Sequence, residues 1–348
     1  MIALRFVGGA FAVFLLLGAF LQHRRRSISR LNLIITWLIC MSIVVLAIAP
    51  GVFNPIFDLF NFRKGGNRRL IGGLLFADVL IFFLLFRNMA NTDSATRSIR
   101  LLVEALALQS FDRSQVKGLP AGQRVLVILP AHNEAENVGA VLHAMPEEVE
   151  GYPVMALVVD DASEDGTSDV ARSAGAVVAR LPIRRGGGLA LRVGYEIALE
   201  FDAVAVVTMD ADGQHVPDEI PLLIKPILAG DADMVNGSRV LGEFERESVV
   251  RHVGVHFFSW LVTVLTGSRV TDVSNGYRAI RAEILKQLVL DQDQFWTSEL
   301  LIEVMRHRLR IIEVPITVRA RASGSSKKPK TLRYARNFTK AIIQTWLR

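Results

Sequence analysis

Apolar residues are concentrated in three long runs near the amino end of the chain. Residues 2–22 and 33–53 are almost continuously apolar, and residues 70–90 form a third run with Asp78 near its middle. Each run has the roughly 20 residues that an α-helix needs to cross the hydrocarbon core of a bilayer. The pattern predicts three membrane-spanning helices that are apolar all round. Because an acid at that depth is costly, we expect Asp78 to face water or a neighbouring helix.

Charged residues between these runs predict how the chain is oriented. The first run ends in a cluster at Arg24–Arg26 and not in a small-residue cleavage site, which favours a membrane anchor over a signal peptide. Positive charge in the first loop favours a cytoplasmic loop, and three spans then leave the rest of the chain cytoplasmic. Basic residues at 63–69 oppose this topology. We expect a multi-pass protein of the plasma membrane whose carboxyl-terminal part is cytoplasmic.

A juxtamembrane segment separates the apolar runs from the rest of the chain. Residues 92–109 have a helical apolar pattern, and Asp93 or Ser94 is suited to cap its start. Residues 114–122 contain the Gly and Pro of a linker. The sequence therefore predicts a transmembrane domain at 1–92 and a helix with linker at 93–123.

After residue 124 the pattern changes to short β-branched runs that alternate with helical stretches. This alternation predicts an α/β domain with a doubly wound, mainly parallel sheet. Ligands bind such sheets at the carboxyl ends of their strands. The strand-like runs are 124–130, 154–160, 176–180, 203–209 and 233–238, and the helix-like stretches are 134–145, 166–174, 187–201 and 217–229.

Composition agrees with a membrane part joined to a soluble part. The 348 residues are 51% hydrophobic with a net charge of +6, and the mean hydropathy of +0.35 is high for a soluble domain. The positive charge suits an anionic membrane or substrate. Nucleic-acid binding has only this charge in its favour, so we expect none. The single cysteine, Cys40, reads as a buried small hydrophobic residue.

Acidic residues follow three of the expected strands. Asp210 and Asp212 come directly after the run at 203–209, where two carboxylates one residue apart can bind a hard divalent cation, Mg²⁺ or Mn²⁺, that bridges to a diphosphate. Gln214 is suited to complete the coordination shell. The alternative for this segment is a solvated acidic turn. Asp161 follows the run at 154–160 and is either a nucleotide contact or part of an Asx turn.

Eight segments between about Val125 and Lys328 carry a resemblance to a known family. Their order and spacing are similar to those of family 2 glycosyltransferases with the GT-A fold, and within these to the dolichol-phosphate and polyprenol-phosphate mannose synthases. The segments are VILPAHNEAENV, VVDDASEDGTSD, GGGLALRVGYEIA, VTMDADGQHVPDEI, MVNGSRV, VTDVSNGYRAI, WTSELLIEV and EVPITVRARASGSSK.

The resemblance implies a role for each matching residue. The metal ligands would be Asp210, Asp212 and Gln214, and the catalytic residues would be Asp212, Arg239 and Arg251, the two arginines touching a phosphate of acceptor or donor. Arg321 and Lys327 would hold phosphates from a mobile loop, for which the alternative is a basic tail on lipid headgroups. The nucleotide-sugar would be bound by Pro130, Ala131, Glu134, Asp161, Gly188, Asp210, Arg321 and Lys327.

The resemblance also implies an activity. The chain would transfer a sugar from a UDP- or GDP-linked donor to polyprenyl or dolichyl phosphate, with inversion and with a divalent metal ion. Many members have Gly-Lys-Gly where this chain has Gly186-Gly187-Gly188, so Arg184 or Arg185 would replace the lysine. The alternative function is a membrane scaffold with a non-catalytic nucleotide-binding domain.

The membrane parts complete the expected domain plan. The amino-terminal runs resemble a three-helix membrane domain that is found fused to such transferases, and homo-oligomers are expected by the same resemblance. Residues 252–266 read as an interfacial helix that guides the lipid, or else as a core helix. The catalytic domain is then 124–328, and 329–348 is a basic amphipathic tail.

Overall fold

The computed structural model describes residues 68–116, 123–244, 249–320 and 332–348, together with eight isolated positions between 17 and 45. The chain divides into two compact units, Met1–Ser94 and Ala95–Arg348. Cys40, in the first unit, is fully buried as predicted.

The helix α4 (Arg68–Ser110) is one continuous helix of 43 residues. It includes the third apolar run at 70–90 and the segment 92–109 that was expected to be a separate helix, so neither Asp93 nor Ser94 begins a helix. Among the described residues no helix is both long and apolar enough to span a bilayer. The runs at 2–22 and 33–53 lie almost wholly outside the described residues.

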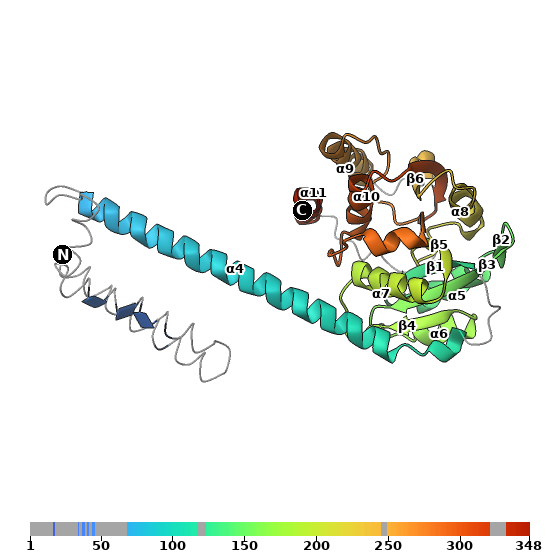
Figure 1. Cartoon of the computed structure of the whole chain (residues 1–348), viewed down its shortest axis with the longest axis horizontal. Helices are drawn as coiled ribbons and strands as arrows, with labels where there is room; N and C mark the ends of the chain where they lie inside the picture. Colours follow the sequence, from blue (N-terminus) through green and yellow to red (C-terminus); the bar gives the residue numbers. More distant parts are fainter. Residues whose placement is uncertain are drawn as a thin grey trace. The chain divides into compact units, whose positions relative to one another are not determined.

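The second unit is built around an eight-stranded sheet with helices on both faces (Figure 1). The strands β3, β1 and β5 are parallel neighbours, and β4 pairs in parallel with the other edge of β3. The order is β2 (Glu148–Val149), β3 (Tyr152–Asp160), β1 (Arg124–Ala131), β5 (Ala203–Thr208), β7 (Arg278–Arg281), β6 (Met234–Phe244) and β8 (Ile311–Val318), and β4 is Val177–Arg180.

The predicted α/β class is confirmed, but the sheet is mixed. β7 runs antiparallel to β5 and β6, which it separates, whereas β6 and β8 are parallel. Sequence periodicity missed β7 because it has only four residues and two of them are arginines. Its partner β6 extends to Phe244, beyond the expected 233–238.

The central strands are buried on both faces, which explains their unbroken apolar runs. Along β1, Leu126 and Ile128 point into one hydrophobic cluster, while Val125 and Val127 point into the other. Side chains of a strand alternate between the two faces, so one strand contributes to both cores.

Helices cover both clusters. α7 (Gly187–Glu200), α9 (Val249–Thr266), α10 (Trp296–Arg306) and α11 (Leu332–Leu347) contribute to the first cluster. The second is covered chiefly by α5 (Ala135–His143) and α8 (Ile220–Leu228), and α6 (Thr167–Ser173) adds Ala171. Short 3₁₀ turns lie at Arg113–Val116, Pro217–Glu219 and Ala282–Gln287.

The carboxyl-terminal helix α11 has the amphipathic pattern expected for the tail. Phe338 and Ile342 are buried, and Arg333, Arg336 and Lys340 are exposed. Phe338 meets Phe258 of α9 edge to face, with 4.5 Å between ring centroids. This contact fixes α11 against α9.

Candidate active site

The parallel strands place the predicted acidic residues at one edge of the sheet. In the ladder of β1 and β3, Ala131 pairs with Asp160, and in the ladder of β1 and β5, Ile128 pairs with Thr208. The segments that follow these strands therefore start from neighbouring positions. This edge is where an open α/β sheet binds its ligands.

The Asp-x-Asp turn is held from its carboxyl-terminal side by His215. The backbone N–H of Asp210 donates to His215 Nδ1 at 3.2 Å, which leaves His215 Nε2–H to donate to Asn275 Oδ1 at 3.0 Å. The His215 ring also stacks on Tyr277, with 4.9 Å between centroids. His215 thus fixes the turn in position.

The other residues of the turn face the loop after β8. Asp212 is buried, and its Oδ1 accepts the backbone N–H of Gln214 at 3.1 Å. Gln214 Nε2 donates to the carbonyl of Arg319 at 3.1 Å, and the N–H of Arg319 donates back to the Gln214 carbonyl at 2.9 Å. The predicted phosphate-binding residues Arg321 and Lys327 follow, outside the described residues.

This turn fits a hard cation that is shared with a ligand. Among the described residues no group of three His, Cys, Asp or Glu side chains is close enough to hold a metal by itself. Mg²⁺ is usually bound through one or two carboxylates, with phosphate oxygens and waters as the remaining ligands. Asp210 and Asp212 would supply the carboxylates, and the amide Oε1 of Gln214 would be a further hard oxygen ligand.

Glu134, predicted to bind the nucleotide, lies buried between the ends of β1 and β3. Its side chain accepts a hydrogen bond from Asn137 Nδ2 at 2.9 Å, and its backbone N–H donates to Thr167 Oγ1 at 2.9 Å. Asn133 before it has a φ of 51°. The loop that starts at Pro130 and Ala131 is therefore held in one conformation by the β3–α6 loop.

Asp160 and Asp161 have different roles in the structure. Asp160 is fully buried and accepts the N–H of Ser163 at 2.7 Å and a guanidinium N–H of Arg180 at 3.0 Å. The bond to Ser163 reaches three residues on, whereas the two-residue Asx turn is formed by Asp165, whose Oδ1 accepts the N–H of Thr167 at 3.1 Å. Asp161 instead turns toward α7.

The Asp161 carboxylate organises the turn before α7. Its two oxygens accept the backbone N–H groups of Arg185 at 2.7 Å and Gly186 at 2.8 Å. Burial raises the pKa of Asp161, although these two hydrogen bonds oppose the shift. Asp161 thus shapes the glycine turn, and each oxygen retains a further lone pair for a ligand.

The glycine turn requires its glycines. Gly186 has a φ of 110°, a conformation that L residues rarely adopt. The N–H of Gly188 donates to the Asp293 carbonyl at 2.8 Å, and a Cβ added at Gly188 would lie 2.0 Å from the Gln292 carbonyl oxygen. No side chain fits at position 188, so the predicted binding residue Gly188 offers only its backbone.

Asp293 is the centre of an ion cluster that no sequence pattern indicates. Its carboxylate pairs with Arg185 at 2.8 Å, Arg192 at 2.7 Å and Arg100 at 3.3 Å. Arg100 comes from α4 and Arg192 from α7. The Arg185 guanidinium, expected to replace a donor-binding lysine, is thus paired with Asp293, while Arg184 is exposed.

Arg239, predicted to touch a phosphate, forms a bidentate pair with Asp272. Its Nε donates to Asp272 Oδ2 at 2.7 Å, and its Nη2 donates to Asp272 Oδ1 at 2.8 Å and to Ser274 Oγ at 2.7 Å. Burial alone would raise the pKa of Asp272, but Arg239 outweighs it and the pKa is lowered. Arg239 also interacts electrostatically with Asp210, so it lies beside the Asp-x-Asp turn.

Trp296, the first residue of α10, also enters the site. A Cβ added at Gly187 would lie 3.3 Å from its Nε1, and one at Gly276 would lie 3.1 Å from its Cη2 and 3.3 Å from Asp210 Oδ1. The WTSELLIEV segment contained this residue, but its order in the sequence gave no signal of the contact. Arg251 lies on α9, and its side chain is outside the described residues.

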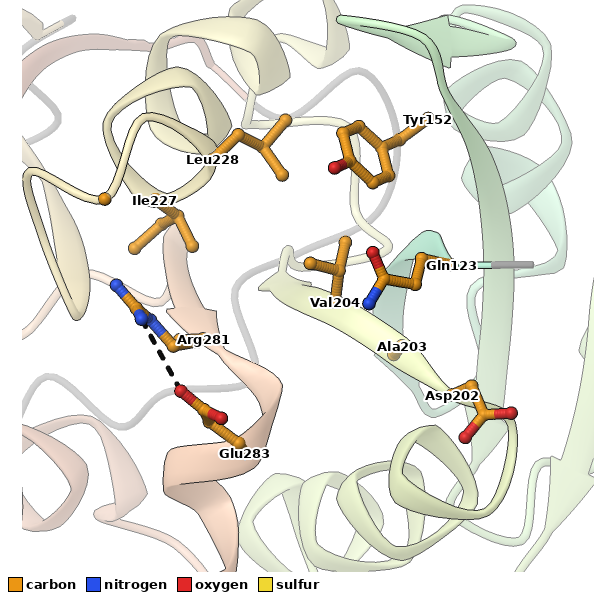
Figure 2. A pocket seen from close by; sticks show the side chains of 10 residues that line it. Gln123, Tyr152, Asp202, Ala203, Val204, Ile227, Leu228, Arg281 and Glu283 are labelled. Carbon is orange, nitrogen blue, oxygen red and sulfur yellow. Dashed lines mark hydrogen bonds and ion pairs between the residues drawn. The ribbon is translucent and has the colours of Figure 1, made fainter.

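A separate pocket of about 540 Å³ lies away from this edge (Figure 2). Gln123, Tyr152 and Ala203, which line it, stand at the starts of β1, β3 and β5. Arg281 and Glu283 form an ion pair on its wall. Because the strands are parallel, this pocket is at the opposite end of the sheet from Asp210.

Comparison with known proteins gives consistent matches to one family. The profile of Glycosyl transferase family 2 matches residues 126–289. The undecaprenyl-phosphate mannosyltransferase of Micrococcus luteus is 34% identical over 59% of this chain and 87% of that protein. The polyprenol monophosphomannose synthase of Mycolicibacterium smegmatis is 34% identical over 59% of this chain and 81% of that protein.

A solved structure has the same fold. The glucosyl-3-phosphoglycerate synthase of Mycobacterium tuberculosis, crystallised with Mn²⁺, UDP and glucosyl-3-phosphoglycerate, superposes with a TM-score of 0.52. It is 25% identical over 65% of this chain and 80% of that chain. The second unit therefore has a GT-A-like mixed α/β fold.

Proposed function

Because this chain belongs to glycosyl transferase family 2, we propose that it transfers a sugar from a nucleotide-sugar to a polyprenyl phosphate. The observation that carries this proposal is the meeting of three elements at one sheet edge. These are the Asp-x-Asp turn, the glycine turn ordered by Asp161, and the buried Arg239–Asp272 pair.

The donor is proposed to lie between the two turns. Asp210, Asp212 and Gln214 would hold Mg²⁺ or Mn²⁺, which neutralises charge on the departing nucleoside diphosphate. The amino terminus of α7 suits phosphate oxygens through its helix dipole, because the N–H groups of Gly186 and Gly188 are already donated to Asp161 and to the Asp293 carbonyl. Pro130, Ala131 and Glu134 are proposed to contact the base and ribose.

Sugar transfer to a phosphate does not require a strong general base. A phosphate monoester is already largely ionised at neutral pH, so the acceptor oxygen is nucleophilic when it arrives. We therefore expect a single in-line attack on the anomeric carbon with inversion. Positioning by the protein and stabilisation of the leaving diphosphate would supply most of the rate.

Arg239 is proposed to position the acceptor through its charge. Its bidentate pairing with Asp272 holds the guanidinium rigidly beside Asp210. Arg251, Arg321 and Lys327 are proposed as further phosphate contacts, since they occupy the matching positions of the family pattern.

The apolar surface of α9 supports a lipid acceptor. Val255, Phe258 and Val262 on one side of the helix are buried. Its other side carries a stripe at helical spacing, with Val253 59%, Phe257 47%, Trp260 59% and Val264 60% exposed. A helix with one core face and one exposed apolar face suits the bilayer interface.

Membrane attachment is proposed from the sequence. The apolar runs at 2–22 and 33–53, which lie almost wholly outside the described residues, have the length and composition of spans. We propose a multi-pass protein of the plasma membrane with its catalytic domain in the cytoplasm, where nucleotide-sugars are found. A homo-oligomer stays a prediction.

The test is transfer by the purified full chain in detergent. It is mixed with polyprenyl phosphate, Mn²⁺ and a panel of radiolabelled UDP- and GDP-sugars, and the organic phase is counted. We expect one donor to give a labelled lipid. Asp212→Asn should remove this product, and the matched control Asp218→Asn, an exposed acid six residues further on, should not.

Two results would contradict the proposal. Binding of nucleotides without a labelled lipid from any donor would instead support the scaffold with a non-catalytic domain. Full activity of Asp212→Asn would refute the metal site. Ligand binding raises apparent stability, so a thermal-shift screen can select the donors to be labelled.

A further inference from the structure

Trp296 lies across the site from the glycine turn to the Asp-x-Asp turn. Its Nε1 edge faces Gly187, and its Cζ2 and Cη2 atoms face Gly276, where an added Cβ would lie 3.2 Å and 3.1 Å from them. Asp210 Oδ1 is 3.3 Å from that same added Cβ. Nε1, Cζ2 and Cη2 lie along the same edge of the indole, so this edge spans the distance between two positions that have no side chain.

The indole of Trp296 is held in place by the first turn of α10 and by the packing of Phe295 on α11. α10 begins at Trp296, and Ser298 Oγ donates to the Phe295 carbonyl at 3.0 Å within its first turn. The Phe295 ring packs against Tyr334 and Phe338 of α11, each with 5.4 Å between centroids. Trp296 itself is half-buried and packs on the first hydrophobic cluster. The ring therefore has a fixed orientation.

The Trp296 N–H makes no hydrogen bond within the part of the chain that the structure describes. An indole N–H usually has a partner when its ring is buried. Here the N–H edge lies between the glycine turn and Asp210, which is where the nucleotide-sugar is proposed to bind. A ligand atom at this place would complete its hydrogen bonding.

The chemistry of the ring selects which part of the donor fits. An indole ring is uncharged. It has a large apolar face and one hydrogen-bond donor, its N–H group. A diphosphate is matched better by a cation, which Asp210 is proposed to hold, and by the positive amino-terminal end of the α7 dipole. A hexose has hydroxyl acceptors and an apolar C–H surface, and these complement an indole.

We propose that Trp296 is a specificity-determining residue whose indole forms one wall of the donor's sugar site and whose N–H donates to a sugar hydroxyl. This rests on the proposed function. Gly187 and Gly276 then serve to admit the ring, because a side chain at either position would meet it.

The test compares two ligands on one variant. Trp296→Phe keeps an aromatic ring and removes the N–H. We expect its affinity for the nucleotide-sugar, and its KM, to weaken by about tenfold, as for the loss of one hydrogen bond. Affinity for the nucleoside diphosphate without sugar should stay within about twofold of the wild type, because that ligand lacks the partner of the N–H.

The controls separate a local effect from a global one. Trp346→Phe, near the end of α11 with Trp346 43% exposed, should leave both affinities unchanged. In the Trp346→Phe protein the nucleotide-sugar should alter tryptophan emission, and in the Trp296→Phe protein that change should be greatly reduced. Gly187→Ala adds a methyl 3.3 Å from Nε1 and should weaken nucleotide-sugar binding in the same direction.

Two outcomes would overturn the inference. One is an unchanged nucleotide-sugar affinity in both Trp296→Phe and Gly187→Ala. The other is an equal loss for nucleotide-sugar and nucleoside diphosphate, which would assign the ring to the diphosphate or to the fold. Failure of the proposed function would look different, because the wild type itself would then transfer no sugar to the lipid.

Discussion

Replacing Asp293 by Asn should destabilise the folded chain and weaken donor binding together. The Asp293 carboxylate neutralises guanidinium groups of Arg100, Arg185 and Arg192, whose side chains are only 10–20% exposed. Asn keeps the size and removes the charge. The backbone carbonyl of Asp293 also accepts the N–H of Gly188, so the ion cluster and the glycine turn are directly joined.

The expected cost follows from which partners remain. Arg100 keeps Asp291 at 2.8 Å, and Arg192 keeps Glu104 at 3.9 Å and the Gln292 carbonyl at 3.2 Å. Arg185 loses its acidic partner. Leaving one mostly buried charge unpaired costs about 3–5 kcal/mol, and partial exposure places this case near the lower end, about 3 kcal/mol.

The assay is thermal unfolding of the full chain in detergent. For a domain of this size, 3 kcal/mol corresponds to a fall in Tm of roughly 6–12 °C. Asp169→Asn is the matched control, because its pair with Arg172 is on the surface with Asp169 85% exposed, and such pairs contribute little. A change in Tm no larger than that of the control would refute the role of the cluster.

Three further predictions concern other parts of the site. Gly188→Ala should abolish nucleotide-sugar binding measured by calorimetry, because the added Cβ would lie 2.0 Å from the Gln292 carbonyl oxygen; retained affinity would contradict the tight turn. Asp272→Asn should lower stability by about 3–5 kcal/mol at neutral pH by leaving Arg239 unpaired. The folded pKa of Asp272 is lowered, so its stabilising effect is complete above the unfolded value of about 3.9 and is lost as pH falls through the folded pKa; acid titration of unfolding should show this in the wild type and not in the variant. Replacing Phe257 and Trp260 together by Ser should slow transfer to long-chain polyprenyl phosphate in vesicles several-fold with the donor KM unchanged, and equal slowing with a short, water-soluble acceptor phosphate would contradict a role at the membrane.

Much of the second unit could be predicted because its strands are short, apolar and separated by helical patterns. The strands β1, β3, β4 and β5 lie within a few residues of the expected runs. The resemblance to family 2 glycosyltransferases with a GT-A fold is confirmed as well. Residues such as Asp210 and Asp161 could be placed together because parallel strand ends meet at one edge.

The remaining features depend on contacts between distant segments, which periodicity does not report. Asp293 gathers arginines from two helices, with Arg100 almost two hundred positions away along the chain. Asp272 pairs with Arg239 across 33 positions of the chain, and this pairing explains why Arg239 is buried. Trp296 lies beside Gly187 because α10 packs near α7, and nothing in the local sequence indicates that approach.

The most direct measurement of the central claim follows the phosphorus of the acceptor. Polyprenyl phosphate, the selected nucleotide-sugar and the full chain are monitored by ³¹P NMR, and the purified product is examined for its anomeric configuration. We predict that the lipid monoester signal is replaced by a phosphodiester as an equal amount of nucleoside diphosphate appears, with the configuration inverted. Release of nucleoside diphosphate while the lipid monoester signal persists would contradict the account.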